Sequence, residues 1–509
     1  MKNSVRIISM LMCLLMVMGI LVSCKGKGTA TGGETTGVEN PVPQDSVATQ
    51  PSGEEGETWE LDENGYAKDK IPEVDLGGRK IAILAWSEGE SWSLASKSGG
   101  DDVIMNEVFI RNLDLKERLN IEIAPVFKRG SWQNNAADRE LLNAALAGTE
   151  EYDLIQSYSL WPPIMATNGI LLNMLNYQFP SFEMPWWPDA LLDSWTQYGA
   201  LFYAADNSSI RVVHSIETMY VNLAMLDNYG VNDILTTVID GKWTLDKLYE
   251  YSGFFHGDAM VDNPDDKLYG LVVDDHSRMD AFYYSTGFNT TVNNAEGKAE
   301  LAFTSQTQLD RITSMVDKVI AIMNRPEATI AKNTQAAMFN KQTAFMVCAL
   351  GDIIRMEADL SYAAIPMPKL DEDQENYQAI NNNGYDVWAI PNTAKDPETS
   401  ALIIEAFASS DYRHLAPFFY DRYLKGRYAV SWQGAEIYDM IRGSVKFDWG
   451  RTGANLDAVG YFRPCFWTGT EVSCNNVFAT KVAAANGSRQ LEAALRETLD
   501  KYRQYASVK

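Results

Sequence analysis

Residues 79–86 read RKIAILAW, an apolar run that predicts a buried strand. An amphipathic helix is predicted next over residues 102–120 (DVIMNEVFIRNLDLKERLN), then a second strand over 121–127 (IEIAPVF). A second helix over 136–148 (AADRELLNAALAG) and a third strand over 152–158 (YDLIQSY) complete the pattern. This β-α-β-α-β order predicts an α/β fold, because right-handed crossovers place the strands in a parallel sheet with helices on its faces.

The ends of these strands are the first candidate site. Ligands of parallel α/β sheets bind beyond the carboxyl ends of the strands. Trp86 and Ser87 lie at the end of the first strand, and Tyr158 to Trp161 follow the third. We therefore expect ligand contacts at these positions.

The first residues indicate export. Lys2 and Arg6 precede an uncharged apolar run over residues 7–22, which is typical of a signal peptide. An uncleaved membrane helix is the alternative, but the run is shorter than the ~20 apolar residues that span a bilayer. Residues 24–75 are mostly rich in Gly, Thr, Pro and Glu, which predicts a flexible tether. The body from about residue 76 onward is long enough for two domains.

Composition limits the classes of partner. The chain has 43 Lys and Arg against 68 Asp and Glu, a net charge of -25, which argues against nucleic acid. It also has 13 Trp and 24 Tyr but only four His and five Cys. The sequence is therefore rich in aromatic stacking surfaces and poor in common metal ligands, and no cofactor is predicted.

Several segments resemble the extracellular solute-binding proteins of bacterial ABC importers, in particular the family-1 group that binds oligosaccharides. Leu21-Val22-Ser23-Cys24 is similar to a lipobox, whose cysteine carries the lipid. In chain order, the other similar segments are residues 150–175 (a strand, ligand loop and helix), 199–231 with its Y-x-N pattern, 242–252 (KWTLDKLYEYS), 339–352 (FNKQTAFMVCALGD), 362–372 (YAAIPMPKLDE) and 383–409 (NGYDVWAIPNTAKDPETSALIIEAFAS).

The resemblance implies a periplasmic-binding-protein-like fold, with two α/β lobes joined by crossing strands that close on a ligand. It implies a signal peptide over residues 1–23, a tether over 24–75, lobe 1 over 76–212 and 346–394, and lobe 2 over 213–345 and 395–509. The chain would be a monomer that is lipid-anchored at Cys24 to the outer face of the cell membrane. It would deliver an oligosaccharide to the permease subunits of an ABC transporter. A peptide or a polyol is the alternative solute.

A sugar presents an apolar face and a belt of hydroxyl groups, so aromatic, amide and carboxylate side chains are the expected contacts. The alternative for each tryptophan is simple core packing. The predicted ligand-binding residues are Trp86, Ser87, Trp161, Tyr220, Asn222, Asn383, Tyr385, Asp386, Trp388 and Trp467, with Trp432 as a further candidate.

An enzyme, such as a surface glycan hydrolase, is the hypothesis from a different class. Asp274, Asp275, His276 and Asp280 form a possible acid/base or metal cluster, although a hydrophilic surface loop explains them more simply. The sequence lacks G-x-S-x-G, a phosphate loop and H-E-x-x-H. Cys348 is predicted to be buried, and a disulfide between Cys465 and Cys474 stays open.

Overall fold

The computed structural model describes residues 59–87, 93–94, 102–131, 133–263, 266–273, 276–330, 339, 342–356, 361–429, 431–452 and 487–506. The expectations for the signal peptide, Cys24, most of the tether, Trp467 and the Cys465–Cys474 pair lie outside these residues. Within them, no helix is both long enough and apolar enough to cross a membrane.

The predicted β-α-β-α-β pattern is confirmed. Its elements are β1 (Arg79–Ser87), α2 (Val103–Leu119), β2 (Ile121–Arg129), α3 (Ala136–Ala147) and β3 (Leu154–Tyr158). β1 lies between β2 and β3 and pairs in parallel with both. β12 (Asp386–Ala389) joins the other side of β3 antiparallel, which gives the order β12-β3-β1-β2. The carboxyl ends of the three parallel strands therefore meet at one edge of this first sheet.

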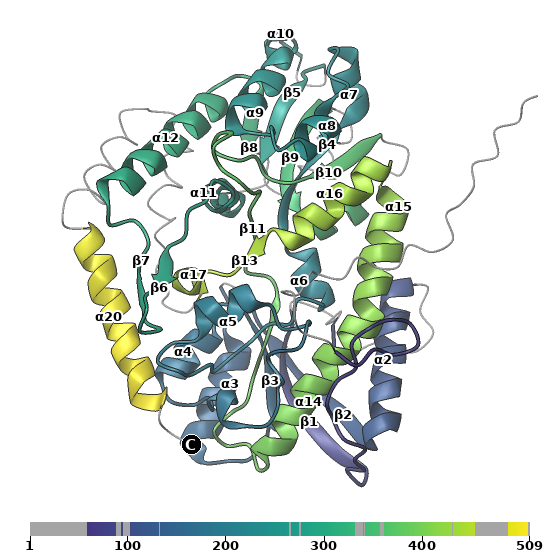
Figure 1. Ribbon diagram of the computed structural model, residues 1–509, viewed down its shortest axis with the longest axis vertical. Helices are drawn as coiled ribbons and strands as arrows, with labels where there is room; N and C mark the ends of the chain where they lie inside the picture. Colours follow the sequence, from purple (N-terminus) through teal and green to yellow (C-terminus); the bar gives the residue numbers. More distant parts are fainter. Residues whose placement is uncertain are drawn as a thin grey trace, which may run out of the picture. The chain divides into compact units, whose positions relative to one another are not determined.

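A second sheet has the order β10-β4-β9-β5-β8. Its strands are β4 (Glu217–Asn222), β5 (Tyr269–Val273), β8 (Ala328–Ile330), β9 (Thr343–Ala349) and β10 (Tyr362–Ile365). The two sheets lie in separate parts of the described body, as Figure 1 shows. Each is the sheet of one lobe.

Helices cover both sheets. The remaining helical elements before β10 are α4 (Pro162–Thr167), η1 (Met174–Asn176), α5 (Asp189–Trp195), α6 (Ile210–His214), α7 (Leu223–Asn228), α8 (Ile234–Ile239), α9 (Leu245–Ser252), η2 (Gly253–Phe255), α10 (His256–Ala259), η3 (His276–Met279), α11 (Asp280–Ser285), α12 (Gln306–Met323) and η4 (Leu350–Arg355). After β10 they are α14 (Pro397–Ser410), η5 (Asp411–Leu415), η6 (Pro417–Lys425), α15 (Gly426–Tyr428), α16 (Trp432–Gly443), α17 (Trp449–Thr452) and α20 (Gly487–Ala506). Two small sheets complete the structure, β6 (Thr291–Asn293) with β7 (Ala299–Leu301), and β11 (Ala379–Ile380) with β13 (Val445–Lys446).

The chain passes between the two sheets three times. It first leaves Ala204, which is bridged to Trp388, and runs through α6 into β4. It returns from β10 through β11 to β12. The third passage is the continuous helix that starts as α14 beside α2, contains the π-helical segments η5 and η6, and leads to α16 beside β10. We call these the three crossing segments.

The predicted lobe boundaries differ from this sheet membership in one region. Residues 346–394 were expected in lobe 1, yet β9 and β10 belong to the second sheet and only β12 belongs to the first. α14, expected in lobe 2, packs against α2 beside the first sheet. The reason is that an apolar run such as β9, with every residue buried, predicts a buried strand but not the sheet that it joins.

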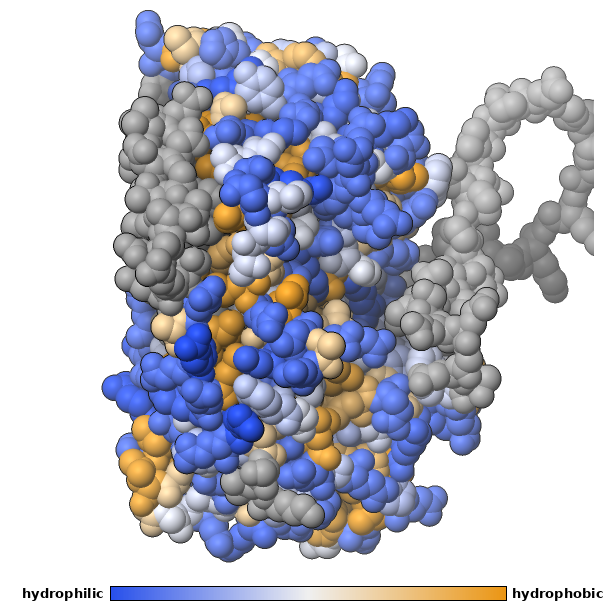
Figure 2. All heavy atoms as spheres, turned by 60° about the vertical axis from the view of Figure 1, so that its left-hand side comes forward, coloured by the Kyte–Doolittle hydropathy of each residue, from blue (hydrophilic) through white to orange (hydrophobic). Residues whose placement is uncertain are grey.

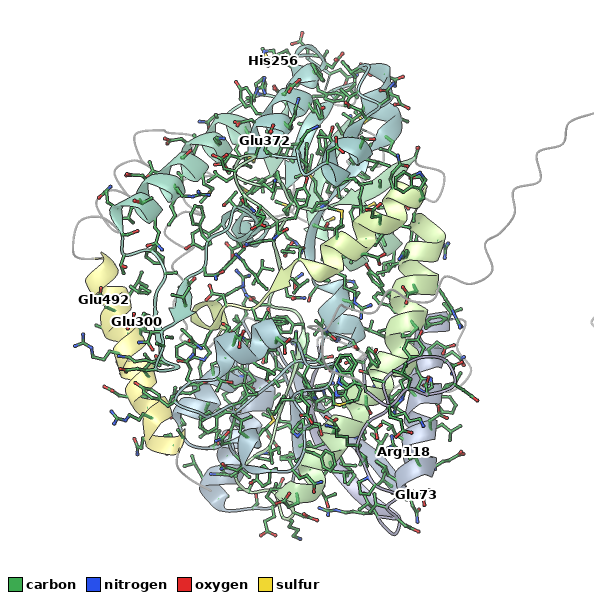
Figure 3. The ribbon with its side chains drawn as sticks, in the orientation of Figure 1. Glu73, Arg118, His256, Glu300, Glu372 and Glu492 are labelled. Atoms are coloured by element: carbon green, nitrogen blue, oxygen red, sulfur yellow. The ribbon has the colours of Figure 1, made fainter. Side chains whose placement is uncertain are left out.

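The carboxyl-terminal helix α20 packs against α4 and β7, and its Glu492 lies near Glu300 of β7 in Figure 3. Leu491, Leu495, Leu499 and Tyr502 form its buried stripe. The Tyr502 hydroxyl donates a hydrogen bond of 2.9 Å to the Tyr203 hydroxyl. Hydrophilic residues cover most of the face drawn in Figure 2, and hydrophobic residues gather near its middle.

Trp388 is a core residue, which corrects the expectation that it stacks on a ligand. It lies in β12 opposite Gln156 of β3 and is 2% exposed, with its ring 5.1 Å from that of Phe407 in α14. The physical reason is the direction of β12. This strand runs antiparallel to β3, so each residue after Asp386 lies farther from the edge where the parallel strands end.

We expect Trp388→Ala to lower the free energy of unfolding by about 3–5 kcal/mol, as is typical when a large core side chain is removed. The control is Trp432→Ala, since Trp432 is 69% exposed on α16 and its loss should change stability by less than about 0.5 kcal/mol. Urea unfolding of both variants measures the difference. Equal effects would show that Trp388 is not part of the core.

Candidate ligand-binding site

The carboxyl edge of the first sheet carries a small aromatic cluster that is separate from the main core. Trp86, Ala137 and Tyr158 form its buried part, and Leu160 and Trp161 pack against it. The Trp86 and Tyr158 rings meet edge to face with centroids 5.1 Å apart. The strand ends that the sequence singled out are thus brought together.

Trp86 is held by Asp386 and Arg211. Its indole Nε1 donates a hydrogen bond of 2.8 Å to Asp386 Oδ1. The Arg211 guanidinium lies 4.3 Å from the centre of its ring, and Arg211 Nε is 3.6 Å from the same Asp386 oxygen. Because Arg211 covers the ring and Trp86 is 3% exposed, a sugar could stack on this face only if Arg211 moved.

Asp386 is fully buried at the start of β12. Burial raises its pKa, and the opposing influences are led by Arg211, with hydrogen bonds from Ser93 and Trp86. Its neighbour Tyr385 is also buried. Asp386 is therefore a structural anchor of the edge, and its predicted contact with ligand stays a prediction.

Among the aromatic side chains of this cluster that the structure describes, Trp161 remains partly accessible. It lies just before α4 and is partly buried, and its Nε1 donates a hydrogen bond of 2.8 Å to the carbonyl of Ser131. Asn383 lies nearby in the chain that leads to β12, where its carbonyl accepts a hydrogen bond of 2.9 Å from Ser159 Oγ. Both keep surface that a ligand could contact.

The Asn383 side chain also contacts α17. Its Oδ1 accepts a hydrogen bond of 3.2 Å from Arg451 Nε, and Arg451 Nη1 is 3.0 Å from Asp280 Oδ2. Asp280 is thus buried in an ion pair. This pairing favours a structural role over the acid/base cluster considered from the sequence, and Asp274 and Asp275 lie outside the described residues.

Two predicted residues have other roles, which corrects their assignment. Tyr220 is fully buried in β4, and its hydroxyl donates a hydrogen bond of 2.6 Å to the carbonyl of Leu350. Asn222 is the N-cap of α7 and accepts a hydrogen bond from the backbone of Met225 at 3.1 Å. The Y-x-N pattern here marks a buried strand and the helix that follows it. Cys348 is buried in β9 as predicted.

A polar pocket opens beside the aromatic cluster. It has a volume of about 270 Å³ and is lined by Ser87, Arg129, Gly130, Ser131 and Asn134. Of these, only Ser87 was predicted. The same rule that singled out the ends of β1 and β3 applies to β2, whose last residue is Arg129, so the signal was present in the sequence.

Asp138 lies behind this edge on the first turn of α3. It is buried and accepts a hydrogen bond of 2.7 Å from Ser157 Oγ, and burial raises the pKa of Asp138 to about 7. In the part of the chain that the structure describes, no three His, Cys, Asp or Glu side chains are placed to hold a metal ion.

The raised pKa of Asp138 predicts a pH dependence of stability. The folded protein keeps this proton up to about pH 7, whereas an unfolded chain loses it near pH 4. The free energy of unfolding contributed by this group therefore falls as the pH rises from about 4 to 7. Asp138→Asn should gain stability relative to the wild type over that range, measured by urea unfolding at pH 5 and pH 8.

The exposed Asp189 of α5 is the matched control, because Asp189→Asn makes the same chemical change at the surface. The difference in the free energy of unfolding between Asp189→Asn and the wild type should be the same at both pH values. A constant difference between Asp138→Asn and the wild type from pH 5 to pH 8 would contradict a raised pKa at Asp138.

Comparison with solved structures identifies the fold. The galacto-N-biose-/lacto-N-biose I-binding protein of the ABC transporter from Bifidobacterium longum is similar with a TM-score of 0.52 and 12% identity, over 85% of this chain and 98% of that one. The sugar-binding protein MalE from Xanthomonas citri has a TM-score of 0.51 and 12% identity, over 84% of this chain and 100% of that one. This chain has the two-lobed fold of these binding proteins. No family model and no curated protein matches the sequence.

The likeness confirms the predicted periplasmic-binding-protein-like fold with its two α/β lobes. At 12% identity it shows the fold alone.

Proposed function

We propose that this chain is a solute-binding receptor that captures a carbohydrate between its two lobes and delivers it to an ABC transporter permease. The observation that carries the proposal is the composition of the edge at β1, β2 and β3. It combines the accessible ring of Trp161 with hydroxyl, amide and guanidinium groups in a pocket beside the crossing segments. Such a mixture suits a sugar, which has an apolar face and many hydroxyl groups.

Closure of the lobes would supply the transport signal. The crossing segments allow one sheet to move relative to the other, and a ligand that contacts both lobes favours the closed form. The two similar structures are described as sugar-binding proteins, one of them in complex with lacto-N-biose, which supports this role. A receptor of this kind needs no catalytic residue.

Binding without turnover is the test. A thermal-shift screen over neutral and acidic oligosaccharides should find a ligand that raises the melting temperature, because a ligand at 100 times its dissociation constant stabilises the native state by ~2.7 kcal/mol. The same ligand should be recovered intact after incubation. Release of shorter sugars would instead support a glycan hydrolase, and no shift with any carbohydrate would contradict the proposal.

Trp161→Ala should weaken binding of the ligand found in that screen. Loss of a stacking contact that contributes about 1–2 kcal/mol to the binding free energy corresponds to roughly a five- to thirtyfold rise in the dissociation constant. Trp161→Phe keeps an aromatic ring but cannot donate the hydrogen bond to Ser131, so it should retain more affinity. Calorimetric titration of both variants separates stacking from positioning, and unchanged affinity in Trp161→Ala would exclude Trp161 from the site.

We further propose that Cys24 carries a lipid that anchors the mature protein to the membrane. The support comes from the sequence alone. It consists of the positively charged first residues, the apolar run that follows them and the LVSC tetrad that ends at Cys24. Wild-type protein expressed in a lipoprotein-processing bacterium should sediment with membranes, whereas Cys24→Ala should lose processing or anchoring. Wild-type protein found soluble and without lipid, its first 23 residues still attached, would contradict this assignment.

A further inference from the structure

We infer that the pocket lined by Ser87, Arg129, Gly130, Ser131 and Asn134 binds the carboxylate of an acidic sugar, a uronic acid residue of the captured carbohydrate. This inference rests on the proposed function and names the class of sugar.

The backbone of the lining is fixed by packing and hydrogen bonds. Ser87 and Arg129 are opposite each other at the ends of β1 and β2, and the Gly130 backbone N–H donates to the Ser87 carbonyl at 3.3 Å. A Cβ at position 130 would lie 2.5 Å from Trp86 Cβ, so only glycine lets the chain pass this close. The pocket is therefore held against the Trp86 ring that Asp386 anchors.

The other wall is equally constrained. Ser131 and Asn134 close a tight turn through backbone hydrogen bonds of 2.8 and 3.2 Å, and the Asn134 side chain accepts from the backbone of Ala136 at 3.1 Å. The Trp161 indole donates a hydrogen bond to the Ser131 carbonyl. A backbone that is ordered before binding loses little entropy when a ligand enters.

Arg129 gives the pocket its charge. Among the residues that the structure describes, no carboxylate lies within ion-pair distance of its guanidinium, whereas the neighbouring Lys128 pairs with Glu140 at 3.2 Å and Arg211 with Asp386. The buried acids Asp386 and Asp138 each accept a hydrogen bond through one carboxylate oxygen, from Trp86 and from Ser157. Within the described residues, the exposed Arg129 side chain thus has no anionic partner, and a ligand can reach it.

A carboxylate is the anion that fits this group best. The planar guanidinium of arginine binds a carboxylate through two parallel hydrogen bonds, which a single hydroxyl group cannot match. The volume of about 270 Å³ is below the roughly 300–1,000 Å³ of pockets that enclose a drug-sized ligand. The pocket thus suits one sugar residue, with its carboxylate on Arg129 and its hydroxyl groups on the serine and asparagine side chains.

The experiment compares matched pairs of ligands. Uronic acid disaccharides and their carboxyl-reduced counterparts, which carry a primary alcohol instead, are titrated by calorimetry into the intact protein. We expect at least one acid to bind roughly ten- to hundredfold more tightly than its neutral counterpart, as a charge-assisted hydrogen-bonded pair allows.

Arg129→Gln should abolish this preference, because it lowers the affinity for the acidic sugar and leaves the affinity for the neutral sugar nearly unchanged. The control is Arg139→Gln on the exposed face of α3, which makes the same change of charge outside the pocket lining and should keep the preference. Melting curves of both variants verify that they fold.

The outcomes separate this inference from the proposed function. Tight binding of neutral oligosaccharides alone, or an Arg129→Gln variant that loses acid and neutral sugar equally, would overturn the uronic acid assignment while the receptor role stands. Failure of every acidic and neutral carbohydrate to bind would count against the receptor role itself.

Discussion

The buried carboxylate of Asp386 is the constraint on which the candidate site depends. A carboxylate removed from water must be compensated by hydrogen bonds or opposite charge, or it destabilises the fold. Here the compensation comes from Trp86 at the end of β1 and from Arg211 in the first crossing segment. These two residues cannot both reach Asp386 Oδ1 unless the end of β1, the start of β12 and α6 take one mutual arrangement. The position of the pocket follows, because Gly130 packs directly on Trp86.

The same electrostatic constraint extends to all three crossing segments. Asp206 lies on the first, Asp386 on the second and Asp411 on the third, and each is buried and interacts with the other two. Burial raises the pKa of Asp411 to about 6 although the Arg111 guanidinium, which pairs with it, opposes the shift. Burial raises the pKa of each of the three groups, which reduces the charge that they place in this low-dielectric region.

The sequence was sufficient for the local pattern and insufficient for its long-range consequences. Apolar periodicity predicted β1, α2, β2, α3 and β3, because strand and helix periods differ and the segments alternate. Apolar periodicity could not show that β9 joins the second sheet. Every residue of β9 is buried, and a buried strand has the same apolar sequence pattern in either sheet. Trp388 was misassigned for a similar reason. The sequence shows only that Trp388 is close to the end of a strand. Whether it lies at the ligand edge or inside the core depends on the direction of β12 relative to β3.

The acidic character of the whole chain and the cationic character of one pocket are compatible because they act over different distances. A net charge of -25 spread over the molecule produces a field that salt screens over about 8 Å at physiological ionic strength. A carboxylate seated against Arg129 is separated from it by hydrogen-bond distance, well inside that length. The average charge therefore mainly lowers the rate at which anionic solutes arrive, whereas the local guanidinium determines how firmly one is held. Selectivity at this site is governed by the side chain at the end of β2 and not by the composition of the surface.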